Sequence, residues 1–254
     1  MFMALLFPAA DSWPVSIDYL NNQSADWMRT LSRNAALDSA DIVFFNPAGT
    51  AMMKDGFYFN FNNQTLFKTF KLSVANPTSA GGIANPGRYT SDEPTLFLPT
   101  MFFVYRKNDL ALSSSLLSVA GGGGADYKDG VPFFMVLPAA YPALGDLVPY
   151  SSSFIGVSMF PSFTINAAYR VLPFLSLSAG GRYIYGYKYY NGKAMFYNSA
   201  GPTLTRVAIK ASKTAHGFTG IFGIDINPVR DLNIGARYET ETYMRWETDQ
   251  KKME

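Results

Sequence analysis

The chain has 254 residues, a net charge of +2 and no cysteine, so a disulfide framework and a thiolate metal site are excluded. No run of about 18 apolar residues occurs, which excludes a transmembrane helix on length. The small net charge, without a lysine or arginine cluster, gives no indication of a nucleic-acid partner.

The beginning of the chain is apolar, and Pro8-Ala9-Ala10 resembles a small-residue cleavage site. We interpret residues 1–14 as the remnant of a signal peptide whose start is missing; an ordinary apolar N-terminus of a mature chain is the alternative. Residues 15–55 do not alternate like strands. They predict a small helical segment, with Ser24 as a possible N-cap and Pro47 as a helix stop.

Residues 56–254 predict about seven long β-strands, each with an apolar and a polar face. The clearest covers residues 232–246, in which alternate positions from Leu232 to Trp246 are mostly apolar and those from Asn233 are mostly polar or charged. Strands this long exceed the roughly 5–6 residues of soluble sheets and are typical of strands that cross an outer membrane at a tilt. The predicted strands are 57–72, 94–105, 110–120, 153–171, 174–190, 205–226 and 232–246.

Short and long connections alternate between these strands. The turns near residues 107, 172 and 229 are short, whereas 73–93, 121–150 and 191–204 read as long loops. Outer-membrane barrels have short periplasmic turns and longer outer loops, so this alternation predicts the orientation of the chain. Seven crossings leave two sheet edges that lipid does not tolerate. We therefore expect the N-terminal portion of a larger barrel; a miscount by one strand is the alternative.

The sharpest local motif is Ala40 to Ala51, which contains Asn46-Pro47-Ala48-Gly49. It resembles the hatch of the outer-membrane long-chain fatty acid and hydrocarbon transporter family (FadL/TodX type), in which an Asn-Pro-Ala-Gly stretch precedes the first strand. The stretches 32–35 and 232–238 are also similar to family sequence. The resemblance covers residues 15–247, although only the hatch motif is specific.

The resemblance implies an all-β fold, a transmembrane antiparallel β-barrel with a small N-terminal helical hatch. Family barrels have 14 strands, so seven would be half. It implies a hatch at residues 15–55 and barrel strands at 56–254. Substrate would pass from an outer groove to an inner pocket, and leave through the hatch or through a gap at a kinked third strand. The hatch or gating residues would be Phe44, Phe45, Asn46, Pro47, Ala48 and Gly49.

Three further features are candidate substrate sites. The glycines 121–124 form either a strand kink or a flexible loop start, and the two readings are about equal. An apolar run either catches hydrophobic ligands or folds into the barrel mouth. Ile184 and Ile221 would face the lumen, together with Arg182, Lys188, Glu239, Glu241 and Arg245. The residues concerned are Gly121, Gly122, Gly123 and Gly124 for the kink, and Phe133, Phe134, Met135 and Leu137 for the run.

Catalysis is not expected, because the single histidine, His216, lies in a predicted strand and no Gly-x-Ser-x-Gly sequence occurs. No metal or other cofactor is indicated. The expected function is passive uptake of fatty acids or aromatic hydrocarbons across the outer membrane of a Gram-negative bacterium. Expected partners are hydrophobic small molecules, the bilayer with its lipopolysaccharide, and the barrel assembly machinery, with the protein a monomer. A structural or adhesive barrel is the alternative; a lipid-modifying enzyme is a more remote one.

Overall fold

The computed structural model describes residues 24–29, 33–73, 87–121, 123–132, 134, 147–198 and 201–253. The predicted signal remnant, 1–14, lies outside these residues, as do Gly122, Phe133, Met135 and Leu137. No helix among the described residues is long and apolar enough to cross a membrane. The elements are α1 (Ala25–Arg29), α2 (Ile42–Phe45), the 3-10 helix η2 (Pro47–Met52), β1 (Gly56–Leu66), β2 (Phe70–Ser73), β3 (Arg88–Ser91), β4 (Thr95–Lys107), β5 (Leu110–Ser118), β6 (Gly123–Tyr127), β7 (Leu147–Met159), β8 (Pro161–Leu172), β9 (Leu175–Asn198), β10 (Gly201–Val229), β11 (Leu232–Glu239) and β12 (Arg245–Met253).

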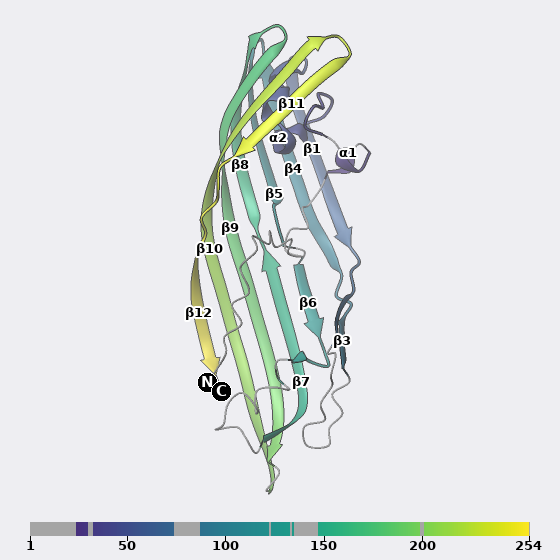
Figure 1. Ribbon diagram of the computed structural model, residues 1–254, viewed down its shortest axis with the longest axis vertical. Coiled ribbons are helices and arrows are strands. Elements are labelled where there is room, and N and C mark those ends of the chain that lie inside the picture. The colour runs from purple at the N-terminus through teal and green to yellow at the C-terminus, as the bar shows by residue number, and fades with distance from the viewer. Residues whose placement is uncertain are drawn as a thin grey trace, which may run out of the picture.

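Seven strands follow one another across the main sheet in the order β1-β4-β5-β8-β9-β10-β11, each antiparallel to its neighbours. The prediction of about seven successive strands is therefore confirmed. β6, β7 and β12 extend this sheet, and β2 pairs with β3 in a separate hairpin. Figure 1 shows the sheet as one long curved wall, with α1 and α2 near the end where β8 turns into β9 and β10 into β11.

The two faces of the wall differ as the alternation predicts. Along β1 and β11, every second residue is exposed and its neighbours are partly covered. The exposed face carries large apolar side chains, including Phe59, Ile165 and Ile234. A water-soluble surface rarely carries so extensive an apolar band, whereas lipid accommodates it. The other face contacts the N-terminal segment and is the inner face of a half-barrel.

The predicted outer loop at 191–204 is wrong. β9 runs on to Asn198 and β10 begins at Gly201, so the two strands pair through this region, with Lys193 opposite Ala208. β7 likewise begins at Leu147, earlier than the predicted start at 153. The physical reason is that strands beyond the lipid need no apolar outer face, so their sequence loses the pattern of apolar outer and polar inner residues that marked the membrane part.

The predicted strand 232–246 is interrupted, which reverses part of its face assignment. β11 ends at Glu239, and Thr240 caps Gly220 by exchanging hydrogen bonds with it. The alternation then resumes one residue out of step. Trp246 consequently packs on the inner side, edge-to-face with Phe160 at 5.9 Å between ring centroids. Glu241 and Arg245, predicted to point into the lumen, lie on the exposed face.

The glycine run interrupts the third strand rather than ending it. β5 ends at Ser118, and the chain rejoins the sheet as β6, which pairs with β7. Gly121 and Gly123 both have φ of +85°, and a β-carbon at Gly121 would lie 2.4 Å from the Ser158 carbonyl oxygen. Only glycine satisfies both conditions. Beside this interruption, β4 pairs with β5 only as far as Met101 opposite Leu116. On its other side, β4 stays paired with β1 as far as Thr95.

Candidate functional site

The N-terminal segment (residues 24–29 and 33–55) rests on the inner face of the wall near its short turns. η2 contacts β5, β8, β9 and β10, and α2 contacts β4 and β5. Its apolar side chains join a buried cluster with the wall. Burial of each large side chain contributes about 1.5–3 kcal/mol. The cluster comprises Ala40, Ile42, Val43, Phe44 and Met53 from the segment, and Phe102, Val104 and Leu117 from β4 and β5.

A buried ion pair holds the N-terminal segment together. Arg33, 1% exposed, donates through Nε to Asp41 Oδ2 at 3.1 Å and through Nη2 to Asp41 Oδ1 at 2.6 Å. Ser24 Oγ also donates to Asp41 Oδ2, at 2.5 Å. The two-point contact fixes the guanidinium and satisfies both carboxylate oxygens, which a buried charge requires.

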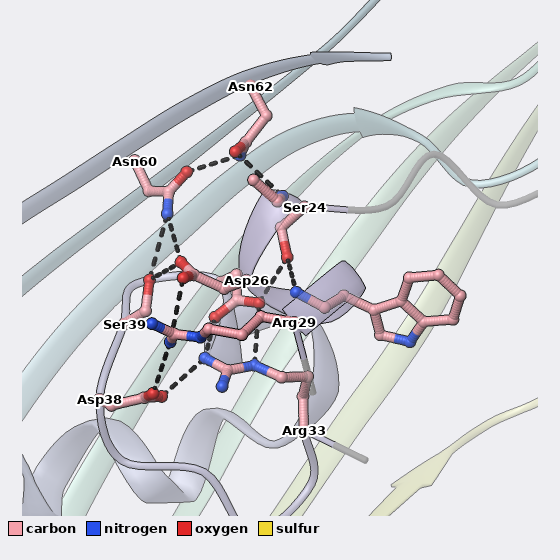
Figure 2. A network of polar contacts seen from close by, with 11 residues as sticks. Ser24, Asp26, Arg29, Arg33, Asp38, Ser39, Asn60 and Asn62 are labelled. Carbon is pink, nitrogen blue, oxygen red and sulfur yellow. Dashed lines mark hydrogen bonds and ion pairs between the residues drawn. The ribbon is translucent and has the colours of Figure 1, made fainter. Parts of the chain in front are cut away.

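The same network continues to the wall (Figure 2). Asp26 accepts hydrogen bonds from Ser39 Oγ at 2.5 Å and from Asn60 Nδ2 at 2.9 Å. Asn62 Oδ1 accepts from the Ala25 N–H at 3.1 Å. Asn60 and Asn62 lie on the inner face of β1, so these bonds attach α1 to the wall. Ser24 also accepts from the Trp27 N–H at 3.0 Å, which confirms its predicted N-cap role.

Asp38 adds a partly exposed branch to this network. Its carboxylate lies 2.7 Å from Arg33 Nη2 and 2.9 Å from Arg29 Nη2. The hydrogen bond from Arg33 holds the pKa of Asp38 below its usual range, against the opposing effect of burial. Because the Asp38 side chain is 53% exposed, solvent screening makes this branch the weaker one.

Asn46 joins the segment to the far side of the wall. Its Nδ2 donates to the Asn34 carbonyl and the Ile224 carbonyl, both at 3.0 Å, and lies 3.2 Å from Asp225 Oδ2. Its Oδ1 accepts from the Ala48 N–H at 3.3 Å and caps η2. One buried amide thus contacts two parts of the segment and β10.

Wall side chains reach back to the same part of the segment. Asn233 Nδ2 donates to the Ala35 carbonyl at 2.8 Å and to Asp225 Oδ2 at 3.0 Å. Ser176 Oγ donates to the Ala48 carbonyl at 2.7 Å. These bonds satisfy two backbone acceptors of the segment, one in the loop before α2 and one in η2. Hydrogen bonds from the wall therefore add to the apolar packing at this contact.

Two glycines of the wall allow this close approach. A β-carbon at Gly235 would lie 2.0 Å from the Asn34 carbonyl oxygen, and one at Gly223 would lie 2.6 Å from Asn46 Oδ1. Neither glycine has a positive φ, so the backbone itself would accept a side chain. Glycine is required at these two positions because the N-terminal segment leaves no space for a side chain, and not because the backbone conformation forbids one.

We expect a Gly235→Val substitution to displace the N-terminal segment while the strand still forms, because valine suits β-structure but collides with Asn34. Trypsin should then cleave after Arg33, which is buried in the wild type. Gly181→Val is the matched control, since a β-carbon there meets nothing closer than 3.7 Å on the exposed face. Equal protection of Arg33 in both variants would contradict the close contact.

Phe44 lies between two arginines of the inner wall. The guanidinium carbons of Arg182 and Arg237 are 5.0 and 5.2 Å from its ring centroid. Glu239 pairs with both arginines, at 2.9 Å from Arg182 Nη1 and 3.3 Å from Arg237 Nη2. Each cation–π contact contributes about 0.5–2 kcal/mol. Arg182 and Arg237 on the inner face therefore contact the N-terminal segment rather than line an open pore.

The other predicted site residues fall in different places. Pro47, Ala48 and Gly49 are buried in η2, and Phe45 is partly buried in α2. Ile184 and Ile221 are buried on the inner face. Phe134 is 1% exposed and packs with Ala194 and Phe196 on the inner side of the wall, so at this residue the apolar run is folded inward.

The Arg33–Asp41 pair and the Asp225–Asn233 pair were not anticipated from sequence. No motif or spacing in the sequence marks either pair. No metal-binding group of three or more His, Cys, Asp or Glu residues occurs within the described ranges.

No protein-family model matches the sequence, and no curated protein matches it. Among solved structures, the fold is similar to the crystal structure of the Ralstonia pickettii toluene transporter TbuX, with a TM-score of 0.56 and 17% sequence identity. The match covers 81% of this chain and 53% of that one, so the chain spans about half the length of the structure it matches. At this identity the likeness shows a shared β-barrel fold.

Proposed function

We propose that the protein mediates passive uptake of hydrophobic compounds across a Gram-negative outer membrane, with the N-terminal segment acting as a hatch. The observation that carries the proposal is the contact between segment and wall. A strand wall with a lipid-facing apolar surface holds, on its inner face, a separate plug through directional polar contacts. An anchoring barrel has no need of such a plug.

The plug is suited to gating because its contacts are of two kinds. The internal Arg33–Asp41 pair keeps the segment intact as a body, whereas Asn46, Ser176 and Asn233 join that body to the wall. Movement of the body breaks the second set, together with the Asn60 and Asn62 bonds and the apolar packing on β4 and β5, and leaves the Arg33–Asp41 pair formed. Such a two-state element is what a gate requires. Gating residues are proposed at Phe44 to Gly49.

The route for substrate is proposed from the outer half inward. The apolar cluster around Phe134 lines the inner face there, and the interruption at Gly121–Gly123 lies beside the end of the β4–β5 ladder. Apolar molecules would leave water on this surface and pass inward by graded burial, which needs no catalysis. Exit would be through the displaced hatch or sideways at the strand interruption.

The substrates proposed are fatty acids or aromatic hydrocarbons, and the protein would lie in the outer membrane as a monomer. Lipopolysaccharide would surround its outer half, and the barrel assembly machinery would insert it. The neighbouring structure, a toluene transporter, supports a hydrophobic substrate in general.

Uptake of labelled toluene and of a labelled long-chain fatty acid by cells expressing the chain tests this function. We expect faster uptake of at least one of them than in cells lacking the chain, and no change for a small sugar. Rates equal to those of cells lacking the chain for every hydrophobic compound would favour a structural barrel.

A further inference from the structure

A cavity opens on the exposed, apolar side of the wall where β4 turns into β5. Its volume is about 370 Å³, which lies within the roughly 300–1,000 Å³ of sites for small molecules. The turn supplies a polar end through Lys107 and Asp109, and strands β4, β5 and β8 supply tyrosine and leucine side chains. The cavity therefore has one charged end and one apolar end.

Strand pairing explains how the apolar end is built. Lys107 lies directly opposite Leu110, and Leu110 lies directly opposite Tyr169. Tyr105 lies directly opposite Leu112. Residues directly paired in a sheet share a face, and these five are all exposed. Because Tyr105 and Tyr169 lie on either side of β5, Leu110 and Leu112 form the floor of a groove between two aromatic rings.

The apolar surface continues along β5 away from the turn. Leu116 lies on the same face as Leu110 and Leu112 and is also exposed. Six residues of extended strand span roughly 20 Å, and each leaflet takes about half of the roughly 30 Å hydrocarbon core of a bilayer. This surface is therefore long enough for one acyl chain that begins at the turn.

The polar end carries one cation more than its carboxylates balance. Asp55, next to the turn, pairs with Arg106. Asp109 pairs with Arg170, at 2.7 Å between Oδ1 and Nη2. Lys107 is exposed and makes no ion pair within the described part of the chain. A lysine ammonium at the end of an apolar groove is suited to a phosphate that is attached to an acyl chain.

Asp109 provides an acceptor beside Lys107. Arg170 donates to Asp109 Oδ1 twice, through Nε at 2.9 Å and through Nη2 at 2.7 Å, which leaves Oδ2 for a ligand donor. The turn backbone is held on both sides, because the Arg170 N–H donates to the Asp109 carbonyl at 2.8 Å and the Asn108 N–H donates to Asp55 Oδ2 at 3.2 Å. A ligand with a phosphate and a neighbouring ammonium matches this pair of charges.

We propose that this cavity binds a phospholipid with an ethanolamine head group. Its phosphate lies at Lys107 and its ammonium at Asp109, and one acyl chain lies along β5 between Tyr105 and Tyr169. With the short turns facing the periplasm, the lipid belongs to the inner leaflet of the outer membrane. The inference rests on the membrane location in the proposed function and not on uptake.

Native mass spectrometry of the full chain, freed of lipid in detergent, tests the site. The probe is dioleoyl phosphatidylethanolamine, and dioleoyl phosphatidylcholine is the comparison, because choline carries the same charge but has no N–H to donate. We expect the ethanolamine lipid to bind at least fivefold more tightly. Lys107→Met should weaken its binding fivefold or more. Arg230→Met is the matched control, because Arg230 is an exposed cation beside Asp231 in the short turn between β10 and β11 and does not line the cavity.

Two further substitutions separate the head group from the acyl chain. Asp109→Asn should abolish the preference for the ethanolamine lipid over the choline lipid, whereas Asp231→Asn should keep it. Leu112→Trp fills the groove with another apolar side chain at an exposed position, so it should weaken the binding of both lipids while the strands still pair.

Equal binding of the two lipids by the wild type would overturn the inference, as would an equal effect of Lys107→Met and Arg230→Met. Toluene and fatty-acid uptake separates the two proposals. Uptake without a preference for the ethanolamine lipid overturns the site alone, whereas the lipid preference without uptake of any hydrophobic compound overturns the uptake function alone.

Discussion

Asp41→Asn is expected to unfold the hatch and to detach it from the wall. The substitution removes the charge that pairs with Arg33, which is 1% exposed and cannot regain water without moving. Breaking one partner of a buried pair costs about 3–5 kcal/mol because the other charge stays buried. The hatch is small, so a loss of this size should unfold it. The barrel strands should remain paired.

The expected readouts for Asp41→Asn are trypsin cleavage after Arg33 and a large rise in ion conductance across a planar bilayer. Asp38→Asn is the matched control, because its carboxylate also pairs with Arg33 but its side chain is 53% exposed. It should change both readouts little. The double variant Arg33→Met with Asp41→Leu should recover protection, since apolar replacement of a buried pair is often tolerated. Conductance in Asp41→Asn equal to that of the wild type would contradict the role given to the pair.

Asn46→Ala is expected to release the hatch from the wall without unfolding it. The change leaves the Asn34 and Ile224 carbonyls and Asp225 Oδ2 without the donor that they share. An unsatisfied buried polar group costs about 1–3 kcal/mol, and the loss comes mainly from the two carbonyls, because Asp225 Oδ2 keeps the Asn233 donor. Uptake should become faster and less selective for size, while the Arg33–Asp41 pair stays formed.

Asn46→Asp should be more damaging than Asn46→Ala, because it places a second carboxylate next to Asp225. Combining it with Asp225→Asn restores one carboxylate and one amide at this contact, and should recover part of the function. Asn63→Ala is the control: Asn63 is exposed on β1 and hydrogen-bonds within the wall, to Leu96 and Leu98. If Asn46→Ala and Asn63→Ala gave the same uptake rates, the anchoring role would be wrong.

The sequence predicts the strand wall better than it predicts the contact between the hatch and the wall. Alternation assigns Leu232 and Ile234 to one face and Asn233 to the other, because the side-chain period of a strand is fixed by its backbone. That signal fails at Thr240, where a local interruption shifts the period by one residue, and in residues 191–198, where the buried inner positions Ala194 and Phe196 are apolar and the outer Lys193 is charged. Neither change can be recognised from the amino-acid composition of these residues.

The contact depends on partners far apart in the chain. Asn46 could be predicted to bond nearby main chain, as it does with Asn34, but Ile224 lies 178 residues away. Arg33 and Asp41 are close in sequence, yet nothing in their spacing says that they are buried together, because burial comes from the wall around them. The need for glycine at Gly235 likewise follows only from the nearness of Asn34.

The most direct test of the account is a reversible cross-link between hatch and wall. Ala51 of η2 belongs to one buried cluster with Ala111 and Ala168 of the wall, so these three positions are the ones chosen for cysteine substitution. The chain has no cysteine of its own. Ala111 and Ala168 are directly paired across β5 and β8, so cysteines at these two positions give a control bridge within the wall.

We predict that oxidised Ala51→Cys/Ala168→Cys and Ala51→Cys/Ala111→Cys lose uptake of hydrophobic compounds and regain it on reduction, whereas Ala111→Cys/Ala168→Cys transports under both conditions. Uptake that continues at the wild-type rate while the hatch is bonded to the wall would show that the hatch does not gate, and would contradict the account.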